Sequence, residues 1–408
     1  MNYNVKKILV VIGGFLLMFN YGLYTSTIGY FTVPVTEALG ISRAAFSSIN
    51  SIQLFVGVIC TPLLVKWLLP KIGQIKLILV AAVACAVGFI GFSISKNIMV
   101  FYVFAVLTGI FYVAHTTIAM SNAIQKWFPV NNGTPMGICM AGSNGCTIIL
   151  GTFMPAFIQK NGWSSGYVIQ AVLCIVMAVI GSILIKGNPN DYEGAPEKVE
   201  VAVGNSADAQ EETGITFKEA LRKPVFYCFL IAAFITAYLC IFVSHVAAFF
   251  SDLGVSPELA GAVLALVSTV ILVSKIGLGV IKDILGMRAS IVLAMTCYAL
   301  GFILLRFNNP VALYTGIVVL GIGMATANVF NPLVAKEAFG SKDFSQIFSV
   351  VNSASILGGG LGGIIWGWIF DTTGSYVPGM TIAPILVVFA AVTMFVMAKP
   401  RAKKVIKA

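Results

Sequence analysis

The sequence predicts an all-α membrane protein, with twelve transmembrane helices arranged in two halves of six. Of the 408 residues, 59% are hydrophobic and only 10% are charged, whereas about 25% of residues are charged in a soluble domain. The mean hydropathy is +0.97, and long apolar segments recur along the whole chain. A soluble core cannot absorb this much apolar surface, so the composition excludes a soluble globular protein.

Twelve segments are apolar over about the 20 residues that a helix needs to cross a bilayer. They are residues 8–30, 44–66, 75–95, 98–122, 135–158, 166–186, 224–246, 258–281, 289–306, 311–333, 346–370 and 379–398. The first segment follows Lys6 and Lys7 and is too long for the core of a signal peptide, so we expect it to remain as a helix.

A long polar stretch separates the sixth segment from the seventh. Residues 187–222 contain eight of the fifteen acidic residues, and a polar, charged composition favours a linker over a packed element. We therefore expect an N-terminal half at residues 1–186, a cytoplasmic linker at 187–222 and a C-terminal half at 223–408. Duplicated halves around a central site are typical of secondary carriers.

The distribution of Lys and Arg predicts the orientation, because basic residues accumulate in cytoplasmic loops. With both termini in the cytoplasm, twenty of the 25 basic residues lie on the cytoplasmic side, and Lys275 lies within a helix. The four basic residues on the outer side are Arg43, Lys96, Lys160 and Arg306. We expect a multi-pass protein of the plasma (inner) membrane. Its net charge of +10 then reflects topology, not binding to nucleic acid.

A loop motif follows the eighth segment, with the pattern Gly279-x-x-x-Asp283-x-x-Gly286-x-Arg288. Its acid and its terminal Arg can hold the ends of neighbouring helices through charge and helix-dipole contacts, so we expect a gate there. The corresponding loop at residues 66–76 keeps a glycine and basic residues but has no acid. The motif resembles the signature loop of the major facilitator superfamily.

Five further motifs occur in order along the chain, at residues 40–47, 126–142, 188–194, 252–260 and 370–376. Together they resemble the monocarboxylate transporter and oxalate:formate antiporter branch of that superfamily. The resemblance covers nearly the whole chain. It implies the major facilitator fold and the facilitated or coupled transport of organic anions.

Lys275 lies inside the eighth segment, and no acidic residue lies three or four positions away along the helix. A lysine near a helix centre costs about 2.5–3.5 kcal/mol on insertion scales. A transported carboxylate would offset this cost. The alternatives are a side chain that extends to the cytoplasmic surface and an acid on another helix. The resembled family commonly has Arg at this position, with a glycine four residues later that matches Gly279. Lysine supplies a point charge in place of a bidentate fork.

His115 lies inside the fourth segment and is the candidate for proton coupling, because histidine titrates near neutral pH. Proton-coupled members of the resembled family carry an Asp one turn before the basic residue, and that position is Ile271 here. The alternative for His115 is a hydrogen bond to a neighbouring helix. His245, at the outer end of the seventh segment, we expect to be an interfacial or gate residue.

Polar residues inside the apolar segments are candidates for lining a cavity. Asn20, Tyr24 and Thr27 share one helix face, and Tyr24 falls where the resembled family has a Tyr near the cavity. The predicted substrate-binding residues are Lys275, His115, Tyr24, Asn20, Tyr112, Tyr238, Asn328 and Asn352. For each Asn the alternative is an interhelical hydrogen bond, worth about 0.6 kcal/mol. A single cation among these residues favours a monoanion over a dianion.

Small residues and thiols have simpler interpretations. Gly359, Gly363 and Gly367 are spaced four apart and predict a helix contact face; the alternative is a hinge. The eight Cys lie in apolar stretches without ligand spacing, so we expect packing residues, without disulfides and without a metal site.

The sequence contains no phosphate loop, nucleophile constellation or cofactor fingerprint, so we expect neither an enzyme nor a cofactor.

We therefore expect a monomeric secondary carrier for small organic monocarboxylates, in which Lys275 pairs with the anion. Three modes of transport are open: symport with a proton, exchange for a counter-anion, and uniport of the substrate alone. Two alternatives remain open: an efflux carrier for larger amphipathic acids or drugs, and a transporter-like sensor that binds without translocation.

Overall fold

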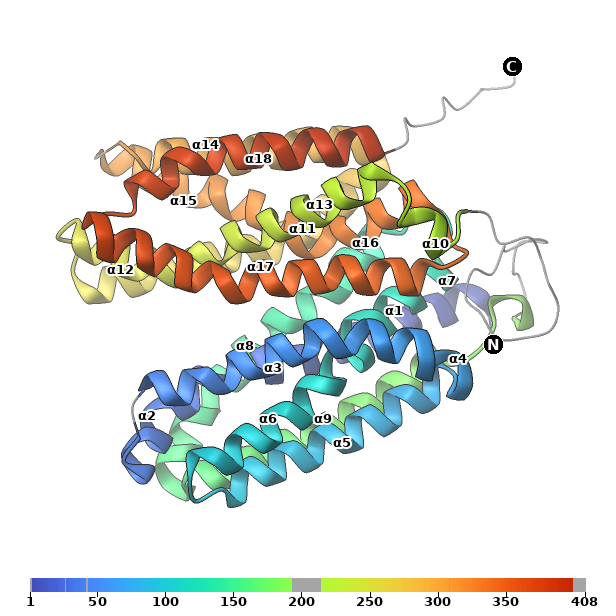
Figure 1. Cartoon of the computed structure of the whole chain (residues 1–408), viewed down its shortest axis with the longest axis horizontal. Helices are drawn as coiled ribbons and strands as arrows, with labels where there is room; N and C mark the ends of the chain where they lie inside the picture. The colour runs from blue at the N-terminus through green and yellow to red at the C-terminus, as the bar shows by residue number, and fades with distance from the viewer. Residues whose placement is uncertain (1, 26, 42, 193–213, 308, 399–408) are drawn as a thin grey trace. The chain divides into compact units, whose positions relative to one another are not determined.

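The computed structural model describes residues 2–25, 27–41, 43–192, 214–307 and 309–398. These residues form helices and connecting turns, with one isolated β-bridge between Gly214 and Gly340. Twelve of the described helical segments are long and apolar enough to cross a membrane. The predicted all-helical architecture with twelve spans is thereby confirmed (Figure 1).

The first group of helices makes up spans one to six. Its members are α1 (Tyr3–Thr25), α2 (Ile28–Leu39), α3 (Arg43–Leu63), the π turn η1 (Leu64–Leu68), α4 (Leu69–Ile72), α5 (Gln74–Ile94), α6 (Ile98–Val113), the π turn η2 (Ala114–Ile118), α7 (Ala119–Trp127), α8 (Gly133–Asn161) and α9 (Trp163–Ile185). The connecting region contains the short elements η3 (Pro189–Asp191) and α10 (Phe217–Ala220). Residues 193–213 of the predicted linker lie outside the described residues.

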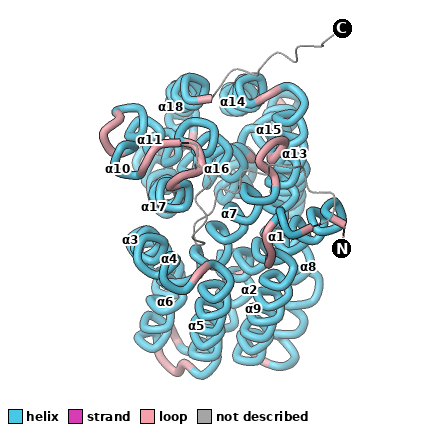
Figure 2. Tube along the Cα trace, turned by 90° about the vertical axis from the view of Figure 1, so that its right-hand side faces the viewer, coloured by secondary structure: helices cyan, strands magenta, loops and turns pink. Residues whose placement is uncertain are grey.

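The second group makes up spans seven to twelve. Its members are α11 (Pro224–Cys240), the 3-10 turn η4 (Ile241–His245), α12 (Val246–Asp252), α13 (Pro257–Leu285), α14 (Met287–Leu304), α15 (Pro310–Met324), α16 (Thr326–Phe339), α17 (Phe344–Thr373) and α18 (Val377–Met397). Figure 2 shows many of these helices nearly end on, with loops at their ends.

The chain divides into two compact units. The first contains residues 1–129, 138–213 and 341–357, and the second contains residues 130–137, 214–340 and 358–408. In the first unit α9 packs against both α1 and α5, and α6 packs against α3 and α5. In the second unit α14 packs against α15 and α18, and α18 also packs against α11. Two helices, α8 and α17, pass from one unit to the other along their length.

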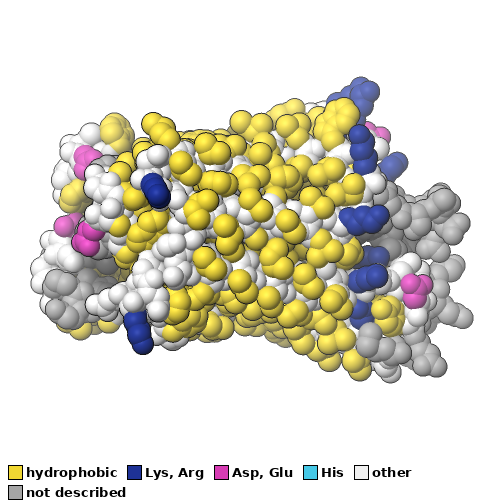
Figure 3. Space-filling model, turned by 90° about the horizontal axis from the view of Figure 1, so that it is seen from below, with side chains coloured by type: hydrophobic (Ala, Val, Ile, Leu, Met, Phe, Trp, Pro, Cys, Tyr) yellow, Lys and Arg dark blue, Asp and Glu magenta, His cyan; other side chains and the backbone are white. Residues whose placement is uncertain are grey.

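The surface between the helix ends is apolar, as a bilayer requires. Figure 3 shows hydrophobic side chains over the middle of one face, with Lys and Arg gathered at one end. Large aliphatic side chains within the spans are also exposed. Ile385 in α18 and Val103 in α6 each have more than 60% of their surface exposed. In lipid this exposure carries no cost, because the acyl chains are as apolar as the side chains.

Two glycines repeat the same backbone turn in the two halves. Gly73, between α4 and α5, has φ 76° and ψ 163°, and Gly286, between α13 and α14, has φ 88° and ψ 167°. An L-residue with a side chain rarely adopts such a positive φ. The turn explains why the two loops that the sequence analysis aligned both keep their glycine.

Several boundaries differ from the predicted ones. The first span was expected to end at residue 30, but α2 continues to Leu39 and includes Glu37, which lies beyond the predicted segment. The helix ends where Gly40 takes φ 62° and its N–H bonds to the carbonyl of Thr36. Hydropathy marks the apolar part of a helix, whereas a cap residue marks its end.

The glycine-rich stretch of α17 contacts its neighbour through a different face from the predicted one. A Cβ at Gly358 would collide with the carbonyl of Phe234, and one at Gly362 would lie 2.9 Å from the carbonyl of Tyr238. At Gly359 a Cβ would meet only ordinary contacts, and at Gly367 it would meet open space. The prediction of a contact face was correct for the helix but wrong for its register. Two sets of glycines, Gly358 with Gly362 and Gly359 with Gly363, have the same spacing of four, so spacing alone cannot choose between them.

Candidate functional site

Helix interruptions recur in the first, fourth, seventh and tenth of the twelve spans. The first is divided between α1 and α2, the fourth contains η2, the seventh ends in η4, and the tenth is divided between α15 and α16. A further π turn, η1, lies at the end of the second span. Interrupted helices at corresponding positions of repeated units are typical of transporter binding sites, and π turns are frequent at functional sites.

Four of the predicted substrate-binding residues lie at these interruptions. Tyr24 is the last residue but one of α1, His115 lies in η2, Tyr238 lies two residues before the end of α11, and Asn328 is the third residue of α16. The interruptions at η2 and η4 had no signal in the sequence, because no proline or glycine marks either turn.

Tyr24, Tyr112 and His115 form one cluster in the first unit. The ring centroid of Tyr24 lies 5.5 Å from that of Tyr112 and 5.8 Å from that of His115. All three side chains are buried, and His115 has no exposed surface. The hydroxyl of Tyr112 is buried and has no hydrogen-bond partner among the described residues. A buried, unsatisfied hydroxyl costs about 1–3 kcal/mol, and an acceptor on a bound molecule would recover that energy.

The hydrogen bonds of His115 define which ring nitrogen carries hydrogen. Nδ1 lies 3.1 Å from the carbonyl oxygen of Phe111, and a carbonyl can only accept, so Nδ1 is the donor. In the neutral ring Nε2 is then an acceptor, and it lies 3.5 Å from the hydroxyl of Tyr24. That hydroxyl also lies 2.9 Å from Sγ of Cys174. A proton on Nε2 would make it a donor, so Tyr24 would then accept from the imidazolium.

Asn20 and Thr27 contact α9 rather than the tyrosine cluster. The amide of Asn20 donates to the carbonyl of Cys174 at 3.0 Å. The hydroxyl of Thr27 accepts from the amide of Gln170 and donates to the carbonyl of Leu23. The contacts with Cys174 and Gln170 are hydrogen bonds between helices, which the sequence analysis gave as the alternative to a cavity-lining role. The sequence analysis missed Cys174 and Gln170, since a lone thiol or amide in an apolar segment has no distinguishing pattern.

Lys275 lies in α13 within the second unit, and only 4% of its surface is exposed. Cys240, at the end of α11, is a near neighbour of Lys275. The backbone of Lys275 packs against Gly137, where any Cβ would collide with the lysine carbonyl. The burial argues against the alternative in which this side chain extends to the surface.

The remaining predicted residues are distributed over both units. Tyr238 stacks on Trp366, with ring centroids 5.8 Å apart and planes at 11°. Asn328 is half-buried in the second unit, and Asn352 is half-buried in the part of α17 that belongs to the first unit. His245 contacts Tyr376, with 3.2 Å between Nδ1 and the hydroxyl. Trp366, which the sequence analysis missed, is fully buried among Tyr238, Phe242 and Phe302.

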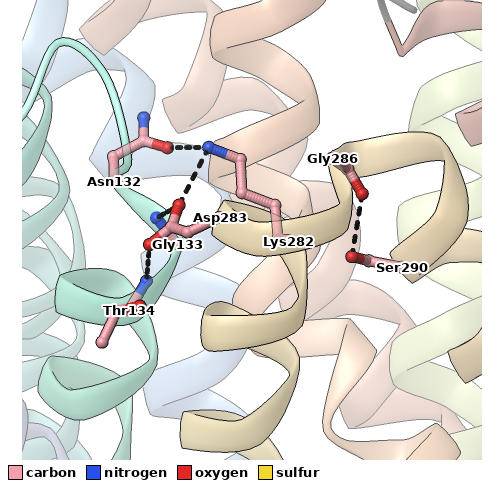
Figure 4. A network of polar contacts seen from close by, with 7 residues as sticks. All are labelled: Asn132, Gly133, Thr134, Lys282, Asp283, Gly286 and Ser290. Atoms are coloured by element: carbon pink, nitrogen blue, oxygen red, sulfur yellow. Dashed lines mark hydrogen bonds and ion pairs between the residues drawn. The ribbon is translucent and has the colours of Figure 1, made fainter. Parts of the chain in front are cut away.

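The loop motif holds the first turn of α8 (Figure 4). Asp283 accepts hydrogen bonds from the backbone N–H groups of Gly133 at 2.9 Å and Thr134 at 2.7 Å. These are donors that a helix N-terminus leaves unsatisfied, and the carboxylate also meets the positive end of the helix dipole. Lys282 donates to the side chain of Asn132 and lies 3.5 Å from Asp283.

The other motif residues have separate roles. Gly279 lets α13 approach α8, because a Cβ there would collide with the carbonyl of Gly133. Gly286 forms the turn into α14 and accepts a hydrogen bond from the hydroxyl of Ser290 at 3.0 Å. Arg288 instead contacts Ala398 and Phe395, at the end of α18. The structure therefore assigns the acid and the arginine of the motif to different neighbours.

Comparisons with known proteins agree with this architecture. The sequence pattern described as the Major Facilitator Superfamily matches residues 10–251 and again residues 241–408. A search of the curated proteins finds no match.

Three solved transporter structures share the fold. The transporter FucP in its outward conformation has a TM-score of 0.71 at 13% identity, over 96% of this chain and 99% of that one. The proton:xylose symporter XylE bound to 6-bromo-6-deoxy-D-glucose has a TM-score of 0.71 at 11% identity, over 96% and 95%. A variant of the E. coli fucose:proton symporter FucP has a TM-score of 0.72 at 14% identity, over 98% and 100%. The chain therefore belongs to the major facilitator superfamily and is a multi-pass membrane transporter rather than an enzyme.

Proposed function

We propose that this transporter moves small organic monocarboxylates by alternating access, and that Lys275 pairs with the carboxylate. The observation that carries this proposal is the 4% exposure of Lys275 within a membrane-spanning helix. Burying an ammonium group in a bilayer is costly, and a substrate anion beside it offsets that cost. A single cation at this position suits a monoanion better than a dianion.

The other contacts to the substrate come from neutral polar groups. Tyr112 contributes its buried hydroxyl, and Tyr24 and His115 lie beside it. Tyr238, Asn328 and Asn352 add a phenol and two amides, while the hydrogen bond of Asn20 to Cys174 gives that residue a supporting role. Contacts that differ between the two access states are what allow a bound substrate to shift the conformational equilibrium.

His115 is the proposed site of proton coupling. Its Nε2 faces the hydroxyl of Tyr24, which can accept from a protonated ring or donate to a neutral one. Proton symport, exchange of two anions and uniport are all compatible with carriers of this type, so the role of His115 needs a direct test.

The topology and the gate complete the proposal. Both termini lie in the cytoplasm, and the protein works as a monomer in the plasma (inner) membrane. The halves are residues 1–186 and 223–408, joined by the linker at 187–222. The contact of Asp283 with the first turn of α8 belongs to the cytoplasmic gate and breaks when the transporter opens inward.

The test is counterflow of labelled lactate, formate, oxalate and a larger aromatic acid in liposomes. Wild type, Lys275→Gln and Lys275→Arg are compared, and Lys96→Gln is the control because Lys96 is an exposed lysine just before α6. A hydrogen bond to a charged group contributes about 1.5–3 kcal/mol, so Lys275→Gln should raise KM by about tenfold or more. Lys275→Arg should retain part of the activity, and Lys96→Gln should match wild type.

The outcomes separate the alternatives. Flux of a monocarboxylate that Lys275→Gln leaves unchanged would contradict the anion-pairing role. Flux of the aromatic acid alone would favour the carrier for larger amphipathic acids. Binding without flux would favour the sensor.

A further inference from the structure

Helices α14 and α18 pack side by side in the second unit (Figure 1), and a groove lies along α14 beside the end of α18. Its volume is about 520 Å³, and it is lined by Arg288, Ala289, Val292, Leu293, Thr296 and Phe395. Val292 is 53% exposed and Leu293 is 44% exposed. The walls of this groove are therefore apolar and open to the surroundings of the helices.

Arg288 stands at one end of the groove, in the first turn of α14, and Phe395 lies in the last turn of α18. The groove thus begins where the apolar spans end, which is the depth of lipid headgroups. From this end its apolar wall continues along α14 through Val292 and Leu293 to Thr296. One charged group at the headgroup level and an apolar channel below it match the two chemical parts of a phospholipid.

The guanidinium of Arg288 is oriented but not neutralised by its described neighbours. Its Nε donates to the carbonyl of Ala398 at 2.9 Å, and its carbon lies 5.0 Å from the ring centroid of Phe395. Asp283, the acid of the same loop motif, bonds instead to the N–H groups of Gly133 and Thr134. Among the described residues no carboxylate pairs with Arg288, so its terminal nitrogens can donate to an external anion.

We propose that this groove binds one anionic phospholipid, with the phosphate on Arg288 and an acyl chain along Val292 and Leu293. Arginine presents paired donors that match a phosphate. The sequence after Ala398 adds Lys399, Arg401, Lys403, Lys404 and Lys407, a density of basic residues typical of segments near anionic lipid surfaces. With cytoplasmic termini, as proposed above, the lipid belongs to the inner leaflet, where anionic lipids are found.

The test uses the full-length protein, purified with phosphatidylglycerol and, separately, with phosphatidylcholine. Native mass spectrometry measures how much lipid each protein retains. Arg288→Gln removes the charge, and Ala289→Trp fills the groove without changing the charge. Arg306→Gln is the matched control, because Arg306 is an exposed arginine just beyond the opposite end of α14. Thermal unfolding of each variant in detergent verifies that it is folded.

We expect wild type and Arg306→Gln to retain one phosphatidylglycerol in preference to phosphatidylcholine. Arg288→Gln should bind it about fivefold more weakly, which corresponds to about 1 kcal/mol for one basic residue at a lipid surface. Ala289→Trp should also lose it. The proposal would be overturned if wild type and Arg288→Gln retained phosphatidylglycerol equally. It would also be overturned if wild type retained phosphatidylglycerol and phosphatidylcholine equally. Displacement of the lipid by millimolar inorganic phosphate would indicate a simple anion site and would also overturn it.

Discussion

At the scale of single residues, the fixed ring of His115 determines what a proton can do in the first unit. The carbonyl of Phe111 keeps hydrogen on Nδ1, so only Nε2 is left to exchange a proton, and Nε2 faces Tyr24. Because the ring is fully buried, a proton reaches it only when the surrounding helices open. A buried histidine with one exchangeable nitrogen can therefore couple a proton to a conformational change.

This arrangement predicts a specific phenotype for His115→Gln. The variant should still exchange substrate for substrate, because counterflow needs no net proton movement. It should lose accumulation driven by a pH gradient, since glutamine cannot be protonated. The measurement is labelled uptake into liposomes with and without an imposed gradient.

Tyr24→Phe is the control, because it removes the hydroxyl next to Nε2 but keeps the histidine. It should reduce substrate affinity and retain the response to the gradient. If His115→Gln accumulated substrate as wild type does, His115 would be excluded as the coupling residue.

At the scale of elements, the packing of α17 against α11 depends on the register of the small residues. Gly358→Ala places a Cβ against the carbonyl of Phe234, whereas Gly367→Ala points into open space. Overpacking of this kind costs about 1–3 kcal/mol. We therefore expect Gly358→Ala to lower the midpoint of thermal unfolding by several degrees and Gly367→Ala to leave it unchanged. Equal midpoints for the two variants would contradict the observed contact face.

The first turn of α8 gives a second prediction at this scale. Asp283→Asn keeps an oxygen that can accept one N–H but loses the charge that faces the helix dipole, an interaction worth about 0.3–1 kcal/mol at exposed sites and up to about 2 when partly buried. The variant should unfold at a lower temperature than wild type at neutral pH. Asp371→Asn is the control, since Asp371 is exposed near the end of α17. No difference from wild type at neutral pH would show that the cap contributes nothing to stability.

At the scale of the whole molecule, the charge distribution predicts the topology. If both termini are cytoplasmic, green fluorescent protein fused after Ala408 should fluoresce. Alkaline phosphatase fused after Lys160 should be active, because the loop that follows α8 would then face outward. Fusions of the opposite reporter at each site serve as controls. The reverse pattern of activity would overturn the orientation and would move the proposed lipid site to the outer leaflet.

The number and the approximate positions of the membrane helices could be predicted from the sequence alone. About 20 consecutive apolar residues partition into a bilayer whatever lies beside them, so the composition of each segment decides whether it spans. The same local reasoning identified Lys275 and His115 as unusual, because an ionisable group in an apolar segment is visible without knowledge of its neighbours.

Only the tertiary structure decided which of these residues meet. The contact of Asp283 with the start of α8 joins residues 150 positions apart, and the contact of Tyr24 with Cys174 joins residues 150 positions apart in the same way. The helix interruptions at η2 and η4 and the contact register at Gly358 also depend on neighbouring helices. In a membrane the hydrophobic effect does not distinguish one apolar helix face from another. Close packing and hydrogen bonds between distant segments therefore choose the face, and a single segment of sequence does not contain that information.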